Sequence, residues 1–238
     1  MIEQSLREPM FRAFLVLILC SVVGLSVLPT LPQATVLYLT CSLLILAYFI
    51  VATAGNIIEK TDRFSIELFL AKPFSRRDII LADFLGTITV VSALSLLLSL
   101  GLWFVFGVRQ NEWGPTFIAL FFSLSLGFIS LYCFIILTGL VIRNVSVVII
   151  TWVGYVYFGA LLLETRADFI YAKMPGLYVR IVLDTVYYSL PHTLSIAKVF
   201  SRFTFNTIND FLPIIFSLAS GTAALMSAVF IFNRRDLD

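Results

Sequence analysis

The chain has 238 residues, of which 60% are hydrophobic and only 13% are charged, and its formal net charge at pH 7 is +2. About one quarter of the residues of a soluble protein are charged, so this composition excludes an ordinary soluble fold and indicates an integral membrane protein. The small net charge gives no reason to expect nucleic-acid binding.

Six apolar runs follow one another along the chain, and the alternating pattern of a transmembrane β-barrel is absent. A helix needs about 20 apolar residues to cross the hydrocarbon layer, and each run is close to this length. We therefore expect one all-α transmembrane domain over residues 1–238. Its spans are predicted at 11–28, 34–54, 85–108, 116–142, 145–163 and 211–232.

The distribution of Lys and Arg predicts that both termini lie in the cytoplasm. With that orientation the cytoplasmic segments carry ten basic residues, whereas the short outer loops carry only Arg109. The cytoplasmic junction Arg143-Asn144 between the fourth and fifth runs is expected to be a tight turn, because one continuous helix would span the membrane about twice over. The prediction is a multi-pass protein of the cell (inner) membrane.

The first run is expected to remain as a helix of the mature protein. Glu3 and Glu8 cancel the positive charge that begins a secretion signal, and no small-residue cleavage site follows.

A charged stretch at 59–86 separates the second and third runs, and it gathers five basic and five acidic residues. Ser75 and Asp78 have the spacing of a capping box, which predicts a helix that begins near Arg76 and continues into the third run. Pro73 disfavours helix at the preceding residue and so separates this helix from what comes before. Upstream, Phe64, Leu68 and Phe69 recur at helical spacing. They predict a short amphipathic helix on the membrane face, although a solvated loop remains the alternative.

Ionisable residues are absent from the centres of all six runs. Ion-driven carriers usually need buried ionisable groups, so this absence disfavours such a carrier, although backbone carbonyls alone can hold Na⁺. No phosphate-binding G-x-x-x-x-G-K-[ST] loop is present, and Cys20, Cys41 and Cys133 lie apart within apolar runs. We therefore expect no catalytic, cofactor or metal site in the chain. Ser92, Ser95 and Ser99 share one face of the third run and are interpreted as packing residues rather than as a substrate path.

The outer segment 164–210 joins the fifth and sixth runs. After Pro175-Gly176, apolar residues recur at helical spacing, which predicts a helix in the outer leaflet rather than a soluble domain. The pattern consists of Leu177, Ile181, Val182, Thr185 and Tyr188. His192 follows Pro191 and is interpreted as a loop residue rather than as a ligand or catalyst.

The loop between the second and third runs resembles the first cytoplasmic loop of ATP-binding-cassette (ABC) transporter permeases of the type 2 exporter family. There a Glu after the second helix is followed by a Leu-rich stretch, a Pro, a Ser-Arg pair, an apolar pair and a Gly. The matching residues here are Glu59, Glu67, Leu68, Leu70, Pro73, Ser75, Arg76, Ile79, Ile80, Leu81 and Gly86. The chain departs from the family at Phe64-Ser65, where Gly-Thr is common, and at Ala82-Asp83, where Gly-Lys is common.

Three further features extend the resemblance over most of the chain. Ile2, Leu6 and Met10 share one helical face, as in an N-terminal elbow helix. Leu190-Pro191 is similar to a Leu-Pro element of some family members, in which Asn is commoner than His at position 192. The basic end of the chain, 232–237, is similar to the short tail of many of these permeases.

The resemblance implies the permease subunit of an ABC transporter, expected to be an exporter, that pairs with a second permease chain as a homodimer or heterodimer. Separate ATP-binding-cassette ATPase subunits would drive it through a coupling helix in the loop 59–84. The implied coupling interface consists of Phe64, Ile66, Glu67, Leu68, Leu70, Pro73, Ser75, Arg76 and Arg77. Two alternatives remain open: an ABC-like membrane assembly or maturation factor or anchor that moves no cargo, and a self-powered secondary carrier.

Overall fold

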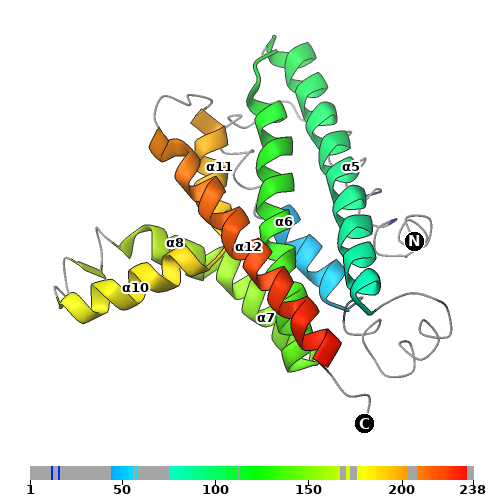
Figure 1. The fold of residues 1–238 in the computed structure, drawn as a ribbon. Coiled ribbons are helices and arrows are strands. Elements are labelled where there is room, and N and C mark those ends of the chain that lie inside the picture. Colours follow the sequence, from blue (N-terminus) through cyan, green and yellow to red (C-terminus); the bar gives the residue numbers. More distant parts are fainter. Residues whose placement is uncertain are drawn as a thin grey trace.

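The computed structural model describes residues 12, 16, 44–55, 57, 76–111, 113–166, 170–171, 176–202 and 208–234. Every regular element within these ranges is a helix (Figure 1). The elements are α5 (Arg76–Gln110), α6 (Thr116–Ile142), α7 (Val145–Gly154), the π-helical turn η1 (Tyr155–Gly159), α8 (Ala160–Glu164), α10 (Leu177–Ser189), α11 (Thr193–Arg202) and α12 (Ile208–Arg234).

Four helical stretches are long and apolar enough to cross a membrane: Arg77–Gln110, Phe117–Ile142, Val145–Glu164 and Phe211–Arg234. They coincide with the third to sixth predicted spans and confirm an all-helical chain of membrane character. A shorter apolar helix, Leu44–Gly55, occupies the second half of the predicted span 34–54. The span 11–28 lies outside the described residues except for positions 12 and 16. Six spans and cytoplasmic termini therefore remain predictions.

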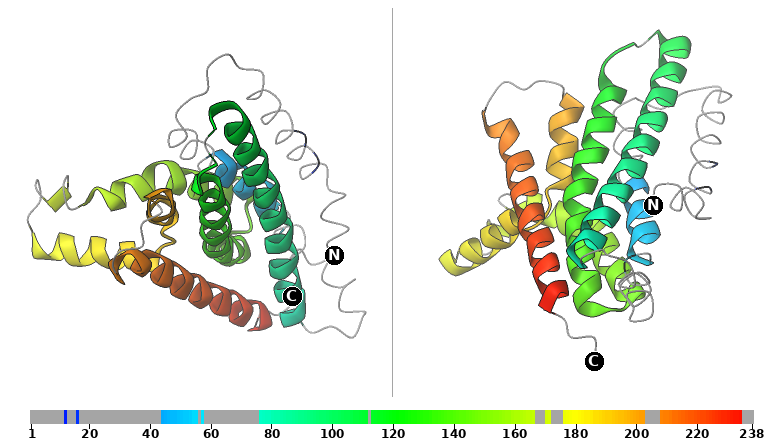
Figure 2. Two further views of the ribbon diagram at one scale, coloured as in Figure 1. Left: turned by 90° about the horizontal axis from the view of Figure 1, so that it is seen from above. Right: turned by 45° about the vertical axis from the view of Figure 1, so that its right-hand side comes forward.

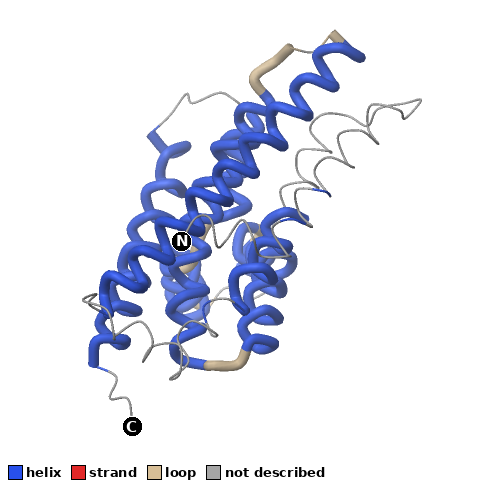
Figure 3. Tube along the Cα trace, turned by 90° about the vertical axis from the view of Figure 1, so that its right-hand side faces the viewer, coloured by secondary structure: helices blue, strands red, loops and turns tan. Residues whose placement is uncertain are grey.

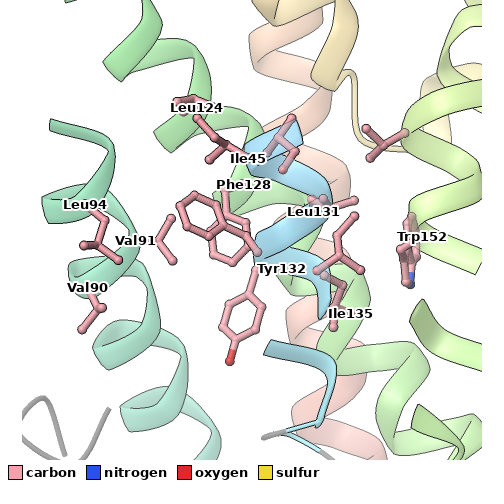
Figure 4. Packing of buried hydrophobic residues seen from close by; sticks show 14 of the residues in the cluster. Ile45, Val90, Val91, Leu94, Leu124, Phe128, Leu131, Tyr132, Ile135 and Trp152 are labelled. Atoms are coloured by element: carbon pink, nitrogen blue, oxygen red, sulfur yellow. The ribbon is translucent and has the colours of Figure 1, made fainter. Parts of the chain in front are cut away.

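Helix α6 is the central helix of the bundle. The membrane-length window of α6 is 67% buried, against 22% for the corresponding window of α12. Helices α5, α11 and α12 all pack against α6 (Figures 1 and 2). In the core, the rings of Phe128 and Tyr132 lie between α6 and Val91 of α5 (Figure 4). Because α6 has apolar side chains on every face, it needs neighbours on every face to bury them.

The two short connections of α6 lie at opposite ends of the bundle (Figure 3). At the connection between α6 and α7, Arg143 adopts a left-handed conformation with φ of 53°, and the side chain of Asn144 accepts a hydrogen bond from the Val147 N–H at 3.2 Å. These two residues end α6 and cap α7, as a helix–turn–helix requires. The predicted tight turn is confirmed.

Helix α5 begins at Arg76 and runs without interruption for 35 residues. At 1.5 Å per residue it is about 52 Å long, well beyond the roughly 30 Å of hydrocarbon. The predicted helix that continues from the charged stretch into the third run is therefore confirmed, while its predicted cap, Ser75, lies outside the described residues. The N-terminal half of α5 is joined to α6 by the Tyr132 hydroxyl, which donates to the Asp83 carboxylate at 2.7 Å and lies 3.1 Å from the Thr87 hydroxyl.

Candidate functional site at the outer helix pair

Most of the predicted coupling residues lie outside the described part of the chain: Phe64, Ile66, Glu67, Leu68, Leu70, Pro73 and Ser75. Of the others, Arg76 begins α5, and Arg77 is exposed in the first turn of that helix. The coupling interface remains a prediction. The polar groups that the structure does bring together lie elsewhere, in the outer segment between α8 and α12.

The outer segment contains a helix pair, α10 and α11, joined by Leu190, Pro191 and His192, which we call the tip. Helix α10 confirms the helix that was predicted after Gly176. Helix α11 was not predicted separately, although Ile196, Ala197 and Phe200 follow Pro191 at helical spacing and are all buried. Phe200 stacks on Phe122 of α6 with ring centroids 6.0 Å apart, so α11 belongs to the bundle.

The tip is inserted between helices of the bundle. The backbone N–H of His192 donates to Ser217 Oγ of α12 at 3.1 Å, and Ser217 Oγ donates to Ser130 Oγ of α6 at 2.8 Å. Ser130 Oγ in turn donates to the Ser217 carbonyl at 2.6 Å. Ser130 is fourteen residues after the start of α6 and twelve before its end. The tip therefore reaches the middle of α6.

Two further contacts hold the tip in place. The Tyr155 hydroxyl of the π-helical turn donates to the Pro191 carbonyl at 2.7 Å. Gly127 of α6 lies opposite Thr193, where a Cβ on the glycine would stand 3.8 Å from the threonine methyl group. The tip and the first residue of α11 thus contact α6, the π-helical turn and α12, three parts of the chain that are far apart in sequence.

Two charged clusters connect the end of α8 with the helix pair. Glu164 accepts a hydrogen bond from Ser195 of α11 at 2.6 Å and pairs with Lys198. Arg166 donates through Nε to Asp184 of α10 at 2.8 Å, and its guanidinium lies 3.6 Å from the centroid of the Tyr187 ring.

Tyr187 links both clusters to the tip. Its hydroxyl lies 3.3 Å from Ser195 Oγ, and because that serine donates its proton to Glu164, Tyr187 is the donor. The Tyr187 ring also packs on the ring of His192, with centroids 4.3 Å apart. A continuous set of contacts therefore runs from Glu164, at the end of α8, to His192 at the level of the middle of α6.

The electrostatics of this cluster differ at its two ends. The Arg166 guanidinium lowers the pKa of Asp184, which favours the ionised carboxylate. Burial, with a contribution from the charge of Arg166, lowers the pKa of His192 from 6.5 to about 4. The buried Nε2 of His192 has no hydrogen-bond partner among the described residues. At neutral pH the imidazole is therefore uncharged, and a proton added to it would enter a buried site beside a cation.

His192 lies between two helices, which confirms its prediction as a loop residue, but its burial was not predicted. The centres of the described spans carry no Asp, Glu, Lys, Arg or His, as expected. The structure nevertheless brings a titratable group from outside the spans to their middle. Among the described residues, no group of three or more His, Cys, Asp or Glu could hold a metal ion. The arrangement can hold charges and respond to protons.

The predicted packing face of α5 lies wholly within the described residues, and Ser92 on it is half-buried. Ser95 and Ser99 are buried, and neither hydroxyl has a hydrogen-bond partner within the described part of the chain. Their buried position agrees with a packing role.

The sequence matches no protein-family model and no curated protein. The family resemblance of the loop thus rests on the residues quoted for it.

Proposed function

We propose that the chain is a membrane permease subunit of an ABC transporter of the type 2 exporter family, moved by a separate ATPase. The observation that carries this proposal is α5, a single helix that starts directly after the Pro73–Ser75 segment and is far longer than the membrane is thick. A helix of this shape can carry a displacement from a cytoplasmic loop into the bilayer. The resemblance of that loop to the family's coupling loop supplies the source of the displacement.

In this proposal the ATPase docks on the short element before Pro73, with Phe64 and Leu68 as apolar anchors. Movement of that element shifts the inner end of α5. The hydrogen bond between Asp83 and Tyr132 transmits the shift to the central helix α6. A second permease chain, identical or related, forms the other half of the pathway in the cell (inner) membrane. The permease itself supplies no cofactor and hydrolyses no nucleotide.

The test replaces both anchors with serine, Phe64→Ser and Leu68→Ser, in the full-length membrane protein. An anchor at the centre of an interface is worth about 2 kcal/mol or more, so we expect the ATPase to be lost from the purified complex. The matched control makes the same two changes at Phe104→Ser and Leu100→Ser on α5, where both side chains are exposed and distant from the loop. Unchanged ATPase binding and transport in the anchor variant would remove the proposal.

One observation keeps the self-powered carrier as a second candidate function. His192 is a titratable group at the level of the middle of α6, where ion-driven carriers hold their relay groups. Reconstitution of the chain alone in vesicles separates the two candidates. Cation-driven uptake without any ATPase would favour the carrier, whereas activity only with an ATPase and ATP would favour the permease.

A further inference from the structure

The membrane-length stretch Val145–Glu164 is not a regular α-helix along its whole length. Between α7 and α8 it contains the π-helical turn η1, in which the N–H of Ala160 bonds to the carbonyl of Tyr155, five residues before it. In an α-helix the N–H bonds to the carbonyl four residues before it, so the turn holds one extra residue. Single π-helical turns of this kind are rare within α-helices, and they occur frequently at functional sites.

The extra residue keeps one side of the stretch buried. The buried residues Val148, Trp152, Val156 and Ala160 recur at every fourth position. Each residue of a straight α-helix turns by about 100°, so positions four apart drift by about 40°, and Ala160 would lie about 120° away from Val148. The π-helical turn takes up about 100° of this rotation and returns Ala160 to the buried side.

The two halves of the stretch pack on different helices. Helix α7 packs on α6, where the indole N–H of Trp152 donates to Thr138 Oγ1 at 2.8 Å. Helix α8 packs on α11, where the carboxylate of Glu164 accepts a hydrogen bond from Ser195 at 2.6 Å and pairs with Lys198. The π-helical turn lies between these two contacts, and it therefore sets the rotation of α8 relative to α7.

The side chain of Tyr155 holds the turn in place. Its hydroxyl donates to the Pro191 carbonyl of the tip at 2.7 Å, and its ring packs edge-on against Trp152 with centroids 5.6 Å apart. The ring also lies over Gly159, where an added Cβ would stand 2.9 Å from Cδ2 of Tyr155. An alanine at Gly159 would therefore displace the ring from the position in which its hydroxyl reaches the tip.

We propose that η1 is a rotational switch, which holds the outer helix pair α10 and α11 in place while it is π-helical and releases the pair when it becomes α-helical. Loss of the hydrogen bond between Tyr155 and Pro191 frees the turn to adopt the ordinary α-helical ladder. Helix α8 then rotates by about 100° relative to α7, which carries Glu164 away from Ser195 and Lys198. The proposal uses contacts among the described helices and does not rest on the proposed function.

The sequence of α8 suits both registers. A shift by one residue brings Leu162 to the place of Leu163, which is 6% exposed, and brings Leu161 to the place of Leu162. Because these three consecutive residues are all leucine, the same kind of side chain is buried in both states, and the main loss falls on the contacts of Glu164. This repetition favours a switch over a permanent bend, which is the other role of a π-helical turn.

The test measures distances between two spin labels by dipolar electron paramagnetic resonance. One label is attached at Ile150→Cys on α7, and the other at Leu161→Cys or Leu162→Cys on α8; all three side chains are exposed. In the π-helical register Leu162 lies on the same side as Ile150, whereas in the α-helical register Leu161 does. The order of the two distances therefore reports the register. The full chain is reconstituted in vesicles of phosphatidylcholine and phosphatidylglycerol, in a background without native cysteines: Cys20→Ala, Cys41→Ala and Cys133→Ser.

Two matched pairs of variants perturb the turn. Tyr155→Phe removes the hydroxyl that holds Pro191, and Tyr157→Phe removes a hydroxyl from the same turn without affecting that bond. Gly159→Ala displaces the ring of Tyr155, whereas Gly154→Ala adds a Cβ that would meet no atom within 4 Å. The two members of each pair make the same chemical change, so a difference between them arises from the contacts of Tyr155.

We expect the background chain to give the shorter distance for the Leu162 label. Tyr155→Phe and Gly159→Ala should each add a population in which the Leu161 label is the closer one, while the two controls keep the original order. The original order in all four variants would show a permanent bend and would overturn the proposal. Distances that broaden without an exchange of order would show that the turn unfolds rather than rotates, and would overturn it as well.

Discussion

The core around α6 and the outer unit of α8 and α10 are built on opposite principles. In the core, apolar side chains interlock, and a few polar contacts such as Asp83 with Tyr132 lie among them. In the outer unit, charged and aromatic groups make the contacts between the elements, and the apolar side chains point outward. The comparison shows that apolar patterning alone does not decide which face of a helix in this protein is inside.

The physical reason is that lipid is as apolar as leucine. Burying an apolar side chain against another helix gains little over leaving it in the bilayer, so close packing and polar contacts decide which faces meet. The core meets this condition by close aromatic packing, and the outer unit meets it by ion pairs and hydrogen bonds. Substitutions in the two regions should therefore change stability by different amounts, and each region needs its own control variant.

The largest effect is expected at Tyr132, which is fully buried in the core. Its ring stacks on Phe128 with centroids 5.3 Å apart. Tyr132→Ala removes this packing and should lower the free energy of unfolding by about 3 kcal/mol or more. Tyr132→Phe keeps the ring and removes only the hydroxyl, at a cost of about 1 kcal/mol. Denaturant titration in detergent micelles measures both. Equal losses of stability in the two variants would mean that packing of the ring does not dominate the stability of the core.

A smaller effect is expected at Gly221, where α12 crosses α6. A Cβ added there would stand 3.2 Å from the Cα and from the Oγ of Ser130, so Gly221→Ala forces the helices apart. Overpacking of this kind costs about 1–3 kcal/mol. The matched control is Gly154→Ala, where an added Cβ would meet no atom within 4 Å. There the better helix propensity of alanine should leave stability unchanged or raise it. Destabilisation at both positions would point to helix flexibility rather than to the crossing.

The third prediction concerns the ion pair of the outer unit. Arg166→Gln removes the charge that faces Asp184 and the contact with the Tyr187 ring. Because the Asp184 side chain is 42% exposed, solvent screening keeps the expected loss to about 1–2 kcal/mol. Hydrogen exchange of α10 should become faster while exchange in α5 stays unchanged. Arg180→Gln, a change of the same kind at an exposed arginine, should have less effect. A uniform increase in the exchange rate across the whole chain would show that α8 and α10 do not open independently of the core.

The smallest effect is a pH dependence at the tip. The pKa of His192 is lowered to about 4 in the folded chain, against 6.5 for an ordinary histidine. The folded chain therefore favours the uncharged imidazole, and the contribution of this preference to stability is fully present above about pH 6.5. It is lost as the pH falls from there toward 4, because the unfolded chain takes up a proton near pH 6.5, whereas the buried imidazole beside Arg166 takes one up only near pH 4.

The pH dependence can be measured as the mobility of a spin label on the exposed Ser189→Cys next to the tip. Mobility should rise as the pH falls from 6.5 toward 4, the window between the ordinary and the lowered pKa of His192, which is the only histidine in the chain. His192→Gln should abolish the rise, because glutamine has no proton to gain in this range. A rise that persists in His192→Gln would assign the response to other groups of the cluster, among them Glu164, Asp184, Lys198, Tyr155, Tyr187 and Tyr188.

The sequence by itself determined the membrane character of the chain. It also determined the positions of the four membrane-length helices. The runs 116–142 and 145–163 recur as α6 and as the stretch from Val145 to Glu164, and the turn at Arg143-Asn144 lies where predicted. These features are local: apolar length, a polar junction and a capping side chain lie within a few residues of each other. Helix α10 was predictable for the same reason.

Only the tertiary structure decided where the outer segment lies. The hydrogen bond between Ser217 and Ser130 joins residues 87 positions apart, and that between Ser195 and Glu164 joins residues 31 apart. No local pattern records such a pair, so the burial of His192 and the packing of α11 on α6 could not be predicted from the chain order. The same limit applies to the polarity of α10: periodicity identifies a helix with an apolar side, but its neighbours decide whether that side faces protein or lipid.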